Sequence, residues 1–189
     1  MYCVMGKTKS GQRVWVAQHP TDITSLFFSP TLWGAEIMRS VTVAKSSLAL
    51  ALHLNPNNRG DTIDLASLAL YETTIEIADV ESGHGAALPD TLADAPHAGA
   101  WAYLITDADG RGFVPLPFLD VPVIHSLAAA YRTQDLADAK RVLAESEGDA
   151  WRIVRARPVM AETPVPRDTV FALMQAEDAE IRAAGFPLG

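Results

Sequence analysis

The feature that most constrains the fold is an alternation of apolar and polar residues on both sides of a turn that contains glycine. Near the start of the chain, Tyr2, Val4, Val14 and Val16 are apolar at every second position, and residues 7–11 (KTKSG) lie between them. A period of two is typical of a strand with one buried face, and glycine accepts the positive φ that a tight turn requires. Residues 2–16 are therefore predicted to form an antiparallel hairpin.

The same arrangement returns in the second half of the chain. Trp101, Tyr103, Ile105 and Phe113 flank the turn sequence of residues 107–112 (DADGRG). Matching positions in the two halves lie 99, 93 and 88 residues apart along the chain. This steady decrease is explained either by an internal duplication in which the loops of the second copy are shorter, or by chance recurrence of a common hairpin–helix–strand pattern.

Each predicted hairpin is followed by a helix and a further strand. Apolar spacing and the flanking turn residues predict helices at Thr42–Leu54 and at residues 134–146. Alternation predicts strands at residues 71–77 and at residues 151–157, the second ended by Pro158.

One segment departs from this scheme. Residues 21–38 are rich in apolar and aromatic side chains and carry Pro30 in the middle. Because proline interrupts a helix, we expect two short helical or irregular pieces that cover a core.

These segments predict an α+β fold of two tandem ββαβ-like units, each a three-stranded antiparallel sheet with one covering helix. The first unit would span residues 1–80 and the second residues 101–160, with a Gly-, Ala- and Pro-rich linker at residues 81–100. Residues 161–189 are expected to form a C-terminal amphipathic helix. The pattern leaves open whether the two sheets join into one or remain as two lobes.

Composition places the protein in the soluble globular class. The 189 residues are 49% hydrophobic and 20% charged, and Cys3 is the only cysteine, so no internal disulfide can form. No apolar run approaches the length of a membrane span, and the first residues lack the pattern of a secretory signal. We therefore expect a cytoplasmic protein without a membrane partner.

The uneven distribution of charge is the strongest indication of function. The net charge is −8, and residues 61–130 carry eleven acidic residues against Arg111 alone. This balance makes nucleic acid an unlikely partner and favours a non-catalytic binding module that presents an acidic surface to a basic protein. The predicted binding residues are Glu72, Glu76, Asp79, Glu81, Asp107 and Asp109. Surplus acids that only maintain solubility are the simpler alternative.

No sequence motif identifies an active site. The histidines show no metal-ligand spacing, and phosphate-binding loops and nucleophile elbows are absent, so we expect no catalytic residue, metal or cofactor. The segment 107–110 (DADG) resembles a calcium loop only in part and is better explained as a hairpin turn. The alternative function is an enzyme whose site forms in residues 81–100, from His84 or His97 with an acid such as Asp90 or Asp94. The C-terminal helix and open sheet edges would also allow a homodimer.

Overall fold

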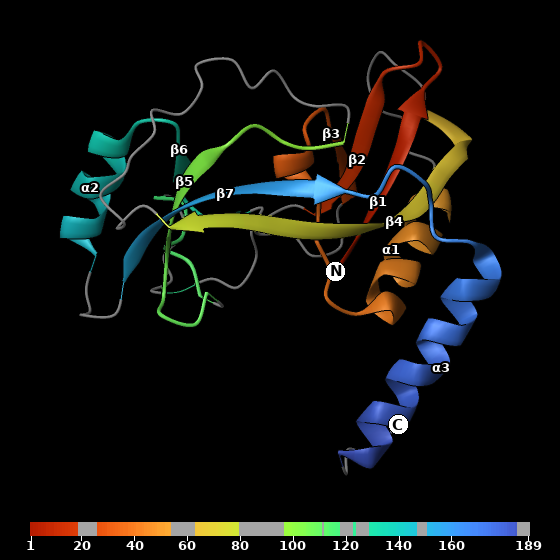
Figure 1. Cartoon of the computed structure of the whole chain (residues 1–189). Coiled ribbons are helices and arrows are strands. Elements are labelled where there is room, and N and C mark those ends of the chain that lie inside the picture. The colour runs from red at the N-terminus through yellow and green to blue at the C-terminus, as the bar shows by residue number, and fades with distance from the viewer. Residues whose placement is uncertain are drawn as a thin grey trace. The chain divides into compact units, whose positions relative to one another are not determined.

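The strands of the described residues form one antiparallel sheet in the order β3-β2-β1-β4-β7-β5-β6 (Figure 1). This computed structural model describes residues 1–18, 26–53, 63–79, 97–110, 112–117, 123, 129–146 and 151–184. The elements are β1 (Tyr2–Thr8), β2 (Arg13–Gln18), β3 (Leu26–Ser29), the 3-10 helix η1 (Leu32–Gly34), α1 (Val41–His53), β4 (Ile63–Asp79), β5 (Ala102–Thr106), β6 (Arg132–Thr133), α2 (Leu136–Glu145), β7 (Arg152–Met160) and α3 (Arg167–Ala183).

The α+β class is confirmed, but the prediction of two tandem three-stranded units with one covering helix each is wrong. β4 and β7, which were predicted as the last strands of separate units, are neighbours in a single seven-stranded sheet. Residues 26–29 form the edge strand β3, in a segment where helical or irregular pieces were expected. The return arm of the second hairpin is reduced to an isolated bridge between Thr106 and Phe113. The prediction of two separate sheets is wrong because β4 is longer than its predicted strand: it continues for 17 residues.

The chain divides into two compact units. Unit 1 comprises Met1–Thr74 and Met160–Gly189, and unit 2 comprises Ile75–Val159. The predicted linker lies mostly outside the described residues, and the internal duplication stays a prediction.

In unit 1 the alternation of β1 produces two apolar faces. Val4 belongs to a core with Val16, Leu68 and Leu70, which packs against Val41, Ala44 and Ala51 of α1. Cys3 and Met5, on the other face, pack with Trp15, Tyr71 and Leu32. The predicted hairpin is confirmed by the pairing of Met5 with Trp15, and Gly11 has a φ of 89° in its turn. Because both faces are buried, the sheet of unit 1 requires the covering segments on each side.

α3 lies beside α1 in unit 1, and the two helices run in opposite directions (Figure 1). Thr42, in the first turn of α1, donates to the Glu177 carboxylate from its backbone N–H at 3.1 Å and from its hydroxyl at 2.7 Å. Farther along α1, the Lys45 ammonium lies 4.2 Å from the centre of the Phe171 ring. Glu177 therefore caps the N-terminus of a helix 135 residues away in sequence, a position where a carboxylate is favoured.

In unit 2, β5 lies between β7 and β6, and α2 covers one side. The core includes Tyr103, Ile105, Ile153 and Ala139. Asp135 caps α2 by accepting a hydrogen bond from the Ala137 N–H at 2.8 Å, which confirms a helix close to the predicted bounds.

Candidate functional site

The predicted acidic residues do not form one described cluster. Glu72 is exposed on β4, in register with Tyr2 of β1. Glu76 forms an ion pair with Arg157, whose Nε atom lies 2.6 Å from the Glu76 carboxylate. The side chain of Asp79 and the whole of Glu81 lie outside the described residues, so the predicted acidic surface stays a prediction.

Asp107 and Asp109 are brought together in a single turn. The Asp107 carboxylate accepts a hydrogen bond from the Gly112 N–H at 2.8 Å, and Gly110 has a φ of 69°. Asp109 is exposed in the same turn. The hairpin-turn interpretation of this segment is therefore confirmed, because the first carboxylate is used to close the turn.

The residues of the alternative enzyme site are mostly outside the described part of the chain. His84, Asp90 and Asp94 lie outside the described residues. The Nδ1 atom of His97 is buried and has no hydrogen-bond partner among the described residues. In the same residues no group of three or more His, Cys, Asp or Glu side chains could hold a metal ion. The enzyme alternative thus stays a prediction.

Trp101 is the centre of a small cationic cluster in unit 2. The guanidinium groups of Arg155 and Arg157 lie 5.0 and 4.8 Å from the centre of its ring. The two arginines are two positions apart on β7 and therefore lie on the same face of the strand. Because Arg157 is already paired with Glu76, the cluster is in part neutralised within the protein.

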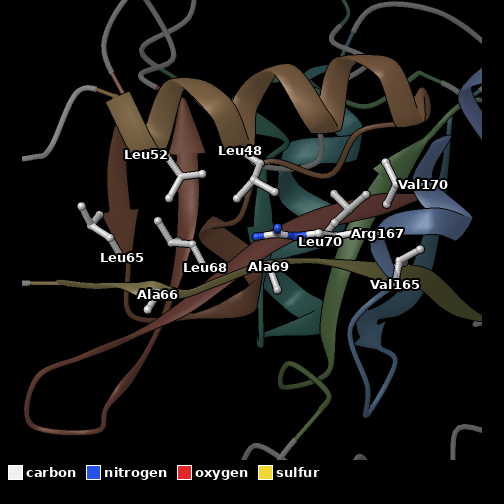
Figure 2. A pocket seen from close by; sticks show the side chains of 10 residues that line it. All are labelled: Leu48, Leu52, Leu65, Ala66, Leu68, Ala69, Leu70, Val165, Arg167 and Val170. Carbon is white, nitrogen blue, oxygen red and sulfur yellow. The ribbon is translucent and has the colours of Figure 1, made fainter.

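A pocket of about 390 Å³ lies within unit 1, and sequence reasoning did not identify it. Its walls come from α1, from the first part of β4, and from the segment that leads into α3 (Figure 2). It is lined by Leu48, Leu52, Leu65, Ala66, Leu68, Ala69, Leu70, Val165, Arg167 and Val170. All of these except Arg167 are apolar, and the volume falls in the range of about 300–1,000 Å³ that is usual for small-molecule sites.

An irregularity of β4 shapes the floor of this pocket. Met5 pairs with Ala69, whereas Lys7 pairs with Asp64, so two steps along β1 face five steps along β4. The additional residues bulge from the ladder, and the Ser67 hydroxyl accepts from the Lys7 N–H at 2.7 Å. Ala66 belongs to this bulge and lines the pocket. A bulge of this kind redirects side chains and is common beside binding sites.

The wall formed by the segment that leads into α3 is held by backbone hydrogen bonds to β4. After the end of β7, Ala161 donates to the carbonyl of Glu72 and Val165 donates to the carbonyl of Leu70, each at 2.8 Å. These bonds fix the start of α3 next to β4. Arg167, the first residue of α3, is thereby directed toward the pocket, where Figure 2 shows its guanidinium among the apolar side chains.

Comparison of the chain with protein-family models, with curated proteins and with solved structures finds no match. Among the described helices, none has both the length and the apolar character of a membrane span.

The sequence did contain a signal for this pocket. In residues 48–52 (LALAL), leucines at alternate positions lie on two sides of a helix, because successive residues are about 100° apart. A helix that covers a sheet with a single face needs leucines on that face only, so leucines on two sides exceed this need. Leu52 is 44% exposed on the pocket side and Leu50 is 36% exposed elsewhere on α1. An excess of apolar residues on a covering helix was thus the available indication.

Proposed function

We propose that the protein is a non-catalytic binding module, and that its binding site is the pocket between α1, β4 and the start of α3. The observation that carries this proposal is a cavity of about 390 Å³ with nine apolar lining residues and one charged one. Such a cavity gains free energy when it exchanges water for apolar groups of a ligand, at roughly 25 cal/mol per Å² of apolar surface removed from water.

The composition of the lining supports binding over catalysis. General acid-base chemistry and covalent catalysis require a titratable or nucleophilic side chain at the bound molecule. Among the described residues that line the pocket, Arg167 is the only ionisable one, and its guanidinium offers hydrogen-bond donors but no acceptor for a proton. The pocket is therefore suited to hold a molecule and to orient it by one charge.

The size of the pocket limits the ligand. The volume of about 390 Å³ lies near the lower end of the range of about 300–1,000 Å³ that is usual for small-molecule sites, which favours a small ligand. A short alkyl chain or a similar slender group fits this limit. Engagement of a basic protein by the acidic residues would use a different surface, and it stays a separate prediction.

Titration with a neutral apolar probe tests the proposal. Decanol, followed by calorimetry, should bind the full-length protein, and Leu52→Gln should weaken that binding about tenfold, because the substitution places an amide on the apolar wall. Leu50→Gln is the matched control, since Leu50 is exposed on the same helix and does not line the pocket. Absence of decanol binding, or an equal loss in both variants, would contradict the proposal.

A further inference from the structure

Among the described residues that line the pocket, Arg167 alone carries a charge. Within the described part of the chain, no carboxylate forms an ion pair with Arg167. Arg141 and Arg157, by contrast, are both paired with carboxylates. A guanidinium beside an apolar surface can lay its carbon stem on that surface and keep its head group hydrated, but it then offers its N–H donors to any anion that enters.

The charges around Arg167 indicate the charge of that anion. Asp168, the next residue, lies in the same first turn of α3 and is exposed. The single positive charge of Arg167 can balance one negative charge of a ligand, and the nearby Asp168 carboxylate repels any further negative charge, so a monoanion is favoured over a dianion. The planar fork of arginine also matches a carboxylate with two parallel hydrogen bonds.

Resting on the proposed binding function, we infer that the ligand is a monoanionic amphiphile: a medium-length alkyl chain that ends in a carboxylate. The chain lies between Leu48 and Leu52 of α1 and Leu65 and Leu68 of β4, and the carboxylate pairs with Arg167 at the start of α3. Decanoate is a slender molecule of this class.

The inference predicts selectivity for head group as well as affinity for the chain. Decanoate should bind the full-length protein about tenfold more tightly than decanol, because a charge-assisted pair is added to the same apolar contact. Decyltrimethylammonium should bind more weakly than decanol, since its cation would face Arg167. Decyl phosphate, as a dianion, should bind no better than decanoate.

Substitution of the arginine separates the two parts of the site. Arg167→Gln should reduce decanoate affinity about tenfold and leave decanol affinity within about twofold of the original value. Arg167→Glu should invert the preference, so that decyltrimethylammonium binds better than decanoate. Arg182→Gln is the matched control, because Arg182 is an exposed arginine near the other end of α3 and does not line the pocket.

The outcomes distinguish the inference from the function on which it rests. If decanol binds in the pocket but decanoate is not preferred, or if Arg167→Gln leaves the preference unchanged, the inferred ligand class is wrong and the binding function survives. If decyl phosphate binds much more tightly than decanoate, the assignment of a monoanion is overturned. If none of the four probes binds, both the inference and the proposed function fail.

Discussion

Glu177 offers the sharpest test of how α3 is held against the rest of unit 1. Its carboxylate accepts two hydrogen bonds from Thr42, and these bonds connect the middle of α3 to the first turn of α1. Partial burial opposes ionisation of this group, but hydrogen bonds from Thr42 and Ser40 and from the first N–H groups of α1 hold the Glu177 pKa below its usual value. The ionised carboxylate is therefore the form that the folded protein stabilises.

The expected loss of stability on removing Glu177 follows from its role as a helix cap. Removal of a helix cap costs about 0.5–2 kcal/mol, and the half-exposed position of Glu177 places the expected loss near 1 kcal/mol. Glu177→Ala removes both acceptors, whereas Glu177→Gln retains one acceptor and removes the charge, so the first variant should lose more. A loss of about 1 kcal/mol raises the population of the opened first turn about fivefold.

Amide hydrogen exchange is the assay, because the Thr42 N–H reports directly on the contact. Its protection should fall about fivefold in Glu177→Ala, while Glu180→Gln, an exposed control on the same helix, should leave it unchanged. Since the folded pKa of Glu177 is lowered, its contribution is present above the unfolded-state value of about 4.3 and is lost as the pH falls through the lower folded-state value. Unchanged Thr42 protection in Glu177→Ala at pH 7 would refute this account.

Three further outcomes are expected. Cys3 is fully buried, and burial raises its pKa to about 11, so a thiol reagent at pH 8 should modify it only in denaturant, and rapid labelling of the native protein would contradict its burial. In Gly34→Ala the new methyl carbon would lie 2.2 Å from the Ser29 hydroxyl oxygen, so urea unfolding should show a loss of about 1–3 kcal/mol, and an unchanged midpoint would show that the turn can adjust. Leu104→Ala should cost about 2–5 kcal/mol because Leu104 is 1% exposed, whereas Val43→Ala, at a position 50% exposed, should change stability by less than about 0.5 kcal/mol. Similar effects of the two substitutions would contradict the burial of Leu104 in β5.

The sequence predicted local elements well because their signals are local. The first hairpin, both covering helices and the C-terminal helix were recognisable from alternation, helical spacing and turn residues. Pro158 was expected to end its strand, but β7 continues through it to Met160. Proline removes one N–H donor, and its neighbours can still pair where that donor is not needed.

The arrangement of the strands could not be predicted in the same way. Nothing in residues 71–77 specifies which strand will become their second neighbour, because either edge of a strand offers the same backbone groups. The pocket was missed for a related reason. Arg167 and Leu65 are about a hundred residues apart in sequence, and they meet only because residues 161–165 return along β4.

Unit 1 is assembled from the two ends of the chain, and this has a consequence for biosynthesis. Its residues 1–74 leave the ribosome before the 85 residues of unit 2, and Met160–Gly189 follow after unit 2. At a synthesis rate of roughly 5–20 residues per second, unit 2 takes about 4–17 seconds to emerge, and the apolar side chains of α1 and β4 are not covered by α3 during that time. During that interval the nascent chain exposes a surface on which chaperones can act, and a ribosome that stalls before Met160 releases a fragment prone to aggregation.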